Sequence, residues 1–129
     1  MKQPNKIVCY TCITGSYDQL RAPSVPQSSD VDFVCFTDDN RLQSDFWQIR
    51  MIPDELKGLS QVKQQRVVKI CPHRYLKEYD ISIWVDGNLE IVGDVRNLID
   101  EYDFGKADLY VRVHPRRNCI YDEAEAVIQ

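Results

Sequence analysis

The feature that most constrains the fold is a continuous apolar run, "IVCYTCI" at residues 7–13, which stops at the polar residues 14–16. Successive side chains of a strand point to opposite faces, so a strand with almost no polar residue is buried on both faces. Such strands are typical of parallel sheets that helices cover on both sides. The run "VDFVCF" at residues 31–36 repeats the pattern and leads into the acids Asp38 and Asp39. Two buried neighbouring strands are therefore predicted.

The rest of the chain alternates between strand and helix patterns. A third strand in "FWQIRMI" is ended by Pro53, and a helix over 61–76 follows that Pro72 kinks or ends early. We then expect a strand at 82–85 and a helix over 94–102 with Asp94 as N-cap. A strand at 107–114 and a last helix from Asp122 complete the chain. This order predicts an α/β fold with a mixed, mostly parallel sheet flanked by helices.

Length and charge limit the classes of protein that fit. The 129 residues suffice for one domain, 1–129, with a modest core. No apolar run is long enough to span a membrane and the start "MKQPNK" has no apolar signal segment, so we expect a cytoplasmic protein. A net charge of −4 argues against broad nucleic-acid binding, which needs a basic face. An anionic ligand would need a local cluster of cations.

The chain has five cysteines, an odd number, mostly inside apolar runs. Buried thiols of this kind behave as small hydrophobic groups, and we expect all five to be reduced. The spacing of Cys9 and Cys12 matches a C-x-x-C motif, but residues three apart in a strand face opposite sides of the sheet. With no second pair, a redox or zinc site is not favoured.

Acids and amides follow the predicted strands, where ligands bind in α/β sheets. Asp86 and Asn88 are two residues apart, so they leave an extended backbone on one face, where their oxygens could hold Mg²⁺ or Mn²⁺. A plain turn explains Asp-Gly-Asn equally well. Asp38 and Asp39 are also open to two interpretations. Either one caps a loop while the other contacts a ribose hydroxyl or a metal, or both are solvated loop acids.

Two groups of cations could bind an anion. Lys63, Arg66 and Lys69 recur every three residues on the predicted helix, which puts them on one side where they either neutralise a diphosphate or form a solvated face. The segment "HPRRN" places His114, Arg116 and Arg117 just after a strand, where guanidinium groups could clamp phosphate or sugar hydroxyls. Neither a P-loop nor a dinucleotide-binding glycine motif is present.

Four segments, "YTCITGSYD", "FVCFTDD", "SIWVDGNLEI" and "HPRRNCIYDEAEAVI", in this order, resemble the glycosyltransferase-like family once catalogued as domain of unknown function 616. The resemblance covers almost the whole chain. It implies a GT-A type fold in which a nucleotide-sugar lies across the strand ends and an Asp-x-Asp motif holds a divalent metal. Asp86 and Asn88 occupy the two positions of that motif, with the amide of Asn88 as a departure from the usual carboxylate.

The resemblance also implies roles for the other strand-end residues. Thr14, Gly15 and Tyr17 would touch the nucleoside, Asp38 or Asp39 the ribose or base, and Arg66 or Lys69 the phosphates. The implied function is a glycosyltransferase, or its donor-binding half, that uses a nucleotide-diphosphate sugar, with UDP as the nucleotide, and a hydroxyl acceptor.

Two other functions stay open. One is a non-catalytic nucleotide-sugar-binding module or scaffold subunit. The other, ranked last, is an aspartate phosphotransfer receiver, where an acid pair should follow the first strand instead of Thr14 and Gly15. Because GT-A enzymes have a further acceptor half, we also expect a truncated domain with uncovered apolar surface. Such a domain would either form a homo-oligomer or have a loosely ordered C-terminal helix.

Overall fold

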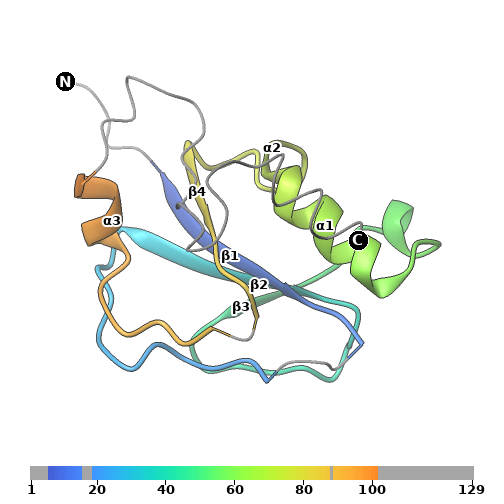
Figure 1. Cartoon of the computed structure of the whole chain (residues 1–129), viewed down its shortest axis with the longest axis horizontal. Helices are drawn as coiled ribbons and strands as arrows, with labels where there is room; N and C mark the ends of the chain where they lie inside the picture. Colours follow the sequence, from blue (N-terminus) through green and yellow to red (C-terminus); the bar gives the residue numbers. More distant parts are fainter. Residues whose placement is uncertain (1–5, 16–18, 88, 102–129) are drawn as a thin grey trace, which may run out of the picture.

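A computed structural model describes residues 6–15, 19–87 and 89–101 (Figure 1). Its elements are β1 (Ile7–Ile13), β2 (Val31–Thr37), β3 (Gln48–Met51), the 3₁₀ helix η1 (Asp54–Leu56), α1 (Gln61–Ile70), α2 (Pro72–Tyr75), β4 (Ile81–Trp84) and α3 (Arg96–Glu101). The strands form one four-stranded sheet in the order β3-β2-β1-β4. All its strand pairs are parallel, which confirms the predicted α/β fold.

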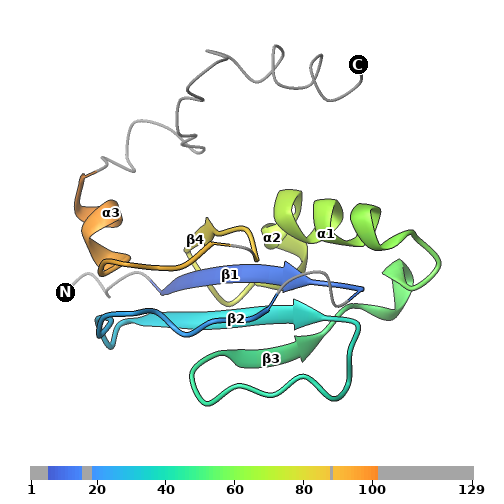
Figure 2. The ribbon, with the colours of Figure 1, turned by 60° about the horizontal axis from the view of Figure 1, so that its bottom comes forward.

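The strands differ in how far they extend along the sheet. β1 pairs with β2 over its whole length, from Ile7↔Val31 to Ile13↔Thr37. β4 pairs with β1 only as far as Tyr10↔Trp84. Figure 2 shows β1, β2 and β3 pointing the same way, so their carboxyl ends meet at one edge. At that edge β1 extends three residues beyond its last pair with β4.

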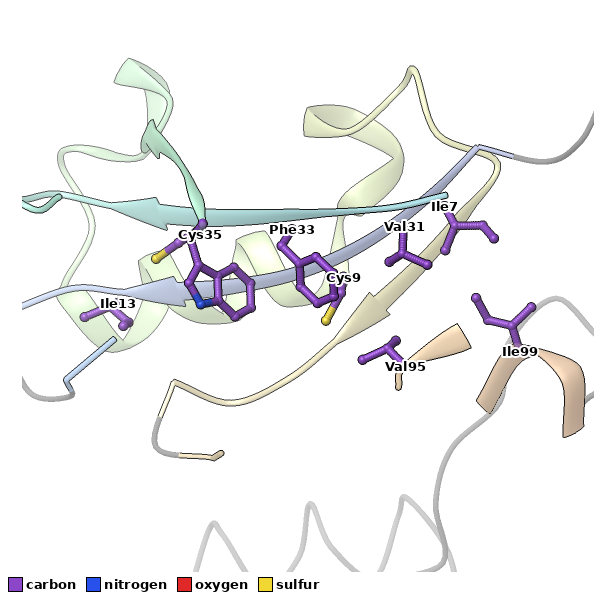
Figure 3. Packing of buried hydrophobic residues seen from close by; sticks show 9 residues of the cluster. Ile7, Cys9, Ile13, Val31, Phe33, Cys35, Val95 and Ile99 are labelled. Atoms are coloured by element: carbon purple, nitrogen blue, oxygen red, sulfur yellow. The ribbon is translucent and has the colours of Figure 1, made fainter. Parts of the chain in front are cut away.

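Alternate side chains of β1 pack on the two faces of the sheet, as its apolar run predicted. On one face, residues of β1 and β2 pack against the helical segment at α1 and α2, in a cluster of Val8, Tyr10, Cys12, Val34, Phe36, Ile52, Leu56, Val68 and Leu76. On the other face, shown in Figure 3, Val95 and Ile99 from the α3 region lie near Ile7 and Val31. Cys9 lies on this second face, so Cys9 and Cys12 are on opposite faces as predicted.

Local signals explain where α1 begins and ends. The side chain of Ser60 caps the first turn by accepting a hydrogen bond from the backbone N–H of Lys63 at 3.3 Å. Pro72 cannot continue the hydrogen-bond ladder, and α1 ends at Ile70 before the one-turn α2. Asp94, the predicted cap of the later helix, accepts from the backbone N–H of Arg96 at 3.1 Å.

Several predicted elements lie outside the described residues. They are the strand at 107–114 and the helix from Asp122, and Cys119 also lies outside the described residues. Within residues 6–15, 19–87 and 89–101, no helix has the length and hydropathy needed to cross a membrane.

The buried thiols give a first testable prediction. Cys9, Cys12 and Cys35 are buried, and this burial raises the pKa of each thiol to about 12. Because the thiolate is the reactive form, we expect these three to resist a disulfide-exchange reagent at pH 8 in the native protein. Unfolding should then expose five titratable thiols. Rapid native reaction of more than two thiols would contradict this account of the core.

Candidate functional site

The strand order locates the point in the sheet where a ligand would bind. The chain adds β2 and β3 on one side of β1 and then places β4 on the other side. The sheet edge beyond the carboxyl ends of β1 and β4 is therefore the topological switch point, where open α/β sheets bind ligands. The residues that follow β1, its neighbour β2 and β4 form the candidate site.

Thr14, directly after β1, holds the start of α1 against the sheet. Its side chain is fully buried and donates a hydrogen bond to the backbone carbonyl of Gln61 at 3.0 Å. The same hydroxyl accepts from the Nε2 of Gln65 at 3.0 Å. These two bonds bring the N-terminus of α1 to the end of β1. The predicted contact between Thr14 and a nucleoside stays a prediction.

Gly15 turns the chain away from the sheet. Its φ of 69° lies in the left-handed region that glycine adopts without steric cost. Its backbone N–H donates to both carboxylate oxygens of Asp38, at 3.2 and 3.3 Å. Asp38 follows β2, so this charge-assisted contact ties together the ends of the two central strands. The sequence analysis proposed both residues for the site, but nothing in the sequence indicated the hydrogen bond between them.

Asp39 forms its hydrogen bonds within its own loop instead. Its Oδ1 accepts from the backbone N–H of Arg41 at 2.9 Å, and its backbone N–H donates to the Oγ1 of Thr37 at 3.1 Å. The Arg41 N–H, followed by the Arg41 guanidinium, holds the pKa of Asp39 below its usual value. Of the two acids, Asp39 thus caps the loop. The contact of Asp38 with a ribose hydroxyl or a metal stays a prediction.

Asp86 lies two residues beyond β4 and is exposed. Its Oδ1 accepts a hydrogen bond from the indole Nε1 of Trp84 at 2.8 Å. Its backbone carbonyl accepts from the N–H of Leu89 at 3.1 Å, which closes a turn. The backbone therefore makes the turn that one interpretation expects, and the carboxylate is hydrogen-bonded to the Trp84 indole. The predicted metal role of Asp86 stays a prediction. Asn88 lies outside the described residues.

Trp84 links Asp86 to the helical face of the sheet. Its ring meets that of Tyr10 edge-on, with centroids 5.3 Å apart, and the Nζ of Lys69 lies 5.8 Å from the centroid of the Trp84 ring. The hydroxyl of Tyr10 donates to the backbone carbonyl of Lys69 at 2.6 Å. The sequence analysis did not identify Trp84 or Gln65 as site residues. The only signal in the sequence was that Trp84 lies two residues before Asp86 and that Gln65 is adjacent to Arg66.

The three cations of α1 differ in what their side chains contact. Lys63, Arg66 and Lys69 are all exposed, as a stripe on one side of α1 predicts. Of these, Lys69 contacts the sheet, through Trp84. With about 100° of rotation per residue, Arg66 lies opposite the buried Val68 and points away from the sheet. The predicted phosphate contact is therefore better suited to Lys69. Tyr17, His114, Arg116 and Arg117 lie outside the described residues.

A shallow cavity of about 400 Å³ lies elsewhere, where β2 begins, and Gln27, Ser28, Asp32 and Gln48 contribute to its lining. The Oε1 of Gln27 accepts from the Val95 N–H at 2.9 Å, and the Ser28 hydroxyl donates to Asp94 at 2.6 Å. These polar groups are already engaged in joining the β2 approach to α3. We therefore do not assign this cavity to the site.

Asp86 is the predicted metal ligand that lies within the described residues. No group of three or more His, Cys, Asp and Glu side chains that could hold a metal occurs among residues 6–15, 19–87 and 89–101. The Oδ2 of Asp86 has no hydrogen bond from another described residue. One carboxylate oxygen suits a cation such as Mg²⁺ that keeps several waters and takes further oxygens from a bound phosphate.

Comparisons with known proteins bear on the whole chain. A family model described as "TOD1/MUCI70, glycosyltransferase-like domain" matches residues 1–129. The probable hexosyltransferase MUCI70 of Arabidopsis thaliana is 24% identical over 143 residues, which cover 98% of this chain. The chain spans 24% of the length of that relative. No solved structure matches. The family match agrees with the resemblance carried by the strand-end motifs, and the chain belongs to the TOD1/MUCI70 glycosyltransferase-like family.

Proposed function

We propose that this domain binds a nucleotide-diphosphate sugar at the β1/β4 switch point and takes part in transferring the sugar to a hydroxyl acceptor. The observation that carries the proposal is the convergence of Gly15, Asp38 and Asp86 on the carboxyl ends of three adjacent parallel strands. Membership in a glycosyltransferase-like family supports the same conclusion. The name of the relative, a probable hexosyltransferase, favours a hexose as the transferred sugar.

The nucleoside end of the donor is assigned to the loop after β1. The left-handed Gly15 has no Cβ, so a flat base or ribose can approach its backbone closely. Asp38 fixes this loop through the Gly15 N–H and presents its carboxylate beside it. A carboxylate accepts hydrogen bonds from ribose hydroxyls or from a base N–H. UDP is our proposed nucleotide, by analogy with the GT-A fold.

The diphosphate is assigned to the space between β4 and α1. Lys69 lies over Trp84 and provides a cation for phosphate oxygens. Asp86 would hold a divalent cation, Mn²⁺ or Mg²⁺, with Asn88 as a second oxygen ligand. When bound, the cation would neutralise the charge that develops on the leaving group. The indole of Trp84 orients Asp86 for this contact.

In the transfer, an oxygen of the acceptor hydroxyl attacks the anomeric carbon of the donor. The bond between this carbon and the diphosphate oxygen breaks, the nucleoside diphosphate leaves with the electron pair, and the proton of the acceptor hydroxyl passes to water. The protein's part that we assign to described residues is to position and electrostatically stabilise the departing diphosphate. We name no catalytic base among them.

A thermal-shift panel tests the proposal. We expect UDP and UDP-hexoses to raise the unfolding temperature more than adenosine or guanosine diphosphates, and the shift to grow when Mn²⁺ is added. A ligand at 100 times its dissociation constant adds about 2.7 kcal/mol to the free energy of unfolding. If no nucleotide or nucleotide-sugar in the panel shifts the transition, with or without metal, the proposed donor site is wrong.

A donor-hydrolysis assay separates an enzyme from the binding-module alternative. Slow release of UDP from UDP-hexose, beyond the rate without protein, would indicate that the chain activates the donor. A clear thermal shift with no release would favour a nucleotide-sugar-binding module instead.

A further inference from the structure

The outward side of α1 carries cations and exposed aliphatic groups on the same surface. At about 100° per residue, Val62, Lys63, Arg66, Lys69 and Ile70 fall within an arc of about 120°, centred away from the buried Gln64 and Val68. We call these five residues the basic face. All five are exposed in the structure.

The charge of the basic face is locally unopposed. The segment 61–77 contains the cations Lys63, Arg66, Lys69, Arg74 and Lys77 and has no Asp or Glu, in a protein whose net charge is −4. None of these five cations forms an ion pair with another described residue. Arg74 and Lys77, which follow α1, are exposed as well. The donor site proposed above would use only Lys69.

Aliphatic side chains on the basic face are the second observation. Ile70 is 70% exposed and Val62 is 55% exposed, and each lies next to cations. Leu59, just before the N-cap of α1, is 38% exposed. A polysaccharide or a nucleic acid could pair with the cations but would gain nothing from these side chains. The boundary between lipid headgroups and acyl chains accommodates both kinds of group.

We propose that the basic face docks on the surface of an anionic membrane. Phosphatidylserine-type headgroups would pair with Lys63, Arg66 and the neighbouring cations, while Val62 and Ile70 enter the headgroup boundary. Lys63, Arg66 and Lys69 on the basic face, together with Arg74 and Lys77 just after α1, make a cluster of five cations. Clusters of four to eight Lys and Arg residues are typical of this kind of binding. The proposal goes beyond the donor site and does not depend on sugar transfer.

Co-sedimentation with lipid vesicles tests the proposal. We expect the full chain to bind vesicles of mixed phosphatidylcholine and phosphatidylserine, to ignore pure phosphatidylcholine, and to dissociate at high salt, which screens exposed charges. The variant Lys63→Gln/Arg66→Gln/Arg74→Gln should bind on the order of 100-fold more weakly, at about tenfold or less per lost cation.

Two further variants decide which feature acts. The control Lys6→Gln/Arg21→Gln/Lys57→Gln changes the net charge by the same amount at exposed residues outside the basic face and should keep most of the binding. Ile70→Ser leaves the charge unchanged and should weaken binding several-fold. Every altered side chain is exposed, so thermal unfolding should match that of the unaltered protein.

The opposite results overturn the proposal. Equal losses in the Lys63→Gln/Arg66→Gln/Arg74→Gln variant and its control would show that only net charge matters. Binding to a soluble polyanion that is as tight as binding to vesicles, and indifferent to Ile70→Ser, would assign the face to an anionic polymer instead of a membrane. A wild-type chain that binds no anionic vesicle at low salt would refute membrane docking directly.

Discussion

Asp86→Ala is expected to remove the Mn²⁺-dependent part of nucleotide stabilisation while leaving the ligand-free protein within about 0.5 kcal/mol of its original free energy of unfolding. The physical reason is that Asp86 is exposed and its carboxylate touches only the Trp84 indole among the described residues. Losing it removes no core packing but takes away the proposed cation ligand. A metal contribution that survives in full in Asp86→Ala would place the cation elsewhere.

Two companion variants make the Asp86 experiment specific. Glu90→Ala removes another exposed acid four residues on and should leave the Mn²⁺ effect intact. Trp84→Phe keeps an aromatic ring against Tyr10 but removes the indole N–H that orients Asp86. Removing such an orienting partner typically weakens metal binding by about 10–100-fold. We therefore expect weakened Mn²⁺ dependence in Trp84→Phe, measured as a higher half-saturating Mn²⁺ concentration.

Tyr10→Ala is expected to be strongly destabilising, lowering the free energy of unfolding by about 3–5 kcal/mol. Tyr10 is only 2% exposed at the centre of the helical-face core, where its ring packs against Trp84. Its hydroxyl also satisfies the backbone carbonyl of Lys69 near the end of α1. The truncation leaves a cavity and an unsatisfied carbonyl, and it withdraws support from the Trp84 ring. Chemical denaturation measures the loss.

Tyr10→Phe is the matched control for this prediction. It keeps the ring and removes only the hydroxyl, so we expect a loss of about 0.5–1.5 kcal/mol from the missing hydrogen bond to the part-buried Lys69 carbonyl. A Tyr10→Ala protein as stable as Tyr10→Phe would show that the ring packing observed between β1 and β4 does not stabilise the domain.

The sequence by itself predicted the elements whose signals are local. The unbroken apolar run of β1 requires burial on both faces, and the structure places its alternate residues in two cores. Pro72 ends α1 through its own ring and missing N–H, so its effect could be read without the fold. The position of Thr14, Asp38 and Asp86 after three strands likewise follows from the pattern alone.

Only the tertiary structure decided what each strand-end residue does. Thr14 is engaged by Gln61 and Gln65, and Asp38 by Gly15, through contacts between residues 23 to 51 positions apart. Such contacts depend on which strands become neighbours, and the periodicity of a segment carries no information about its neighbours in the sheet. The same holds for β4, whose pairing with β1 stops at Tyr10↔Trp84 and so sets Asp86 beside the longer β1. The burial pattern in the sequence therefore predicts which segments are strands, whereas the strand order and register of the folded sheet determine which residues come together at the site.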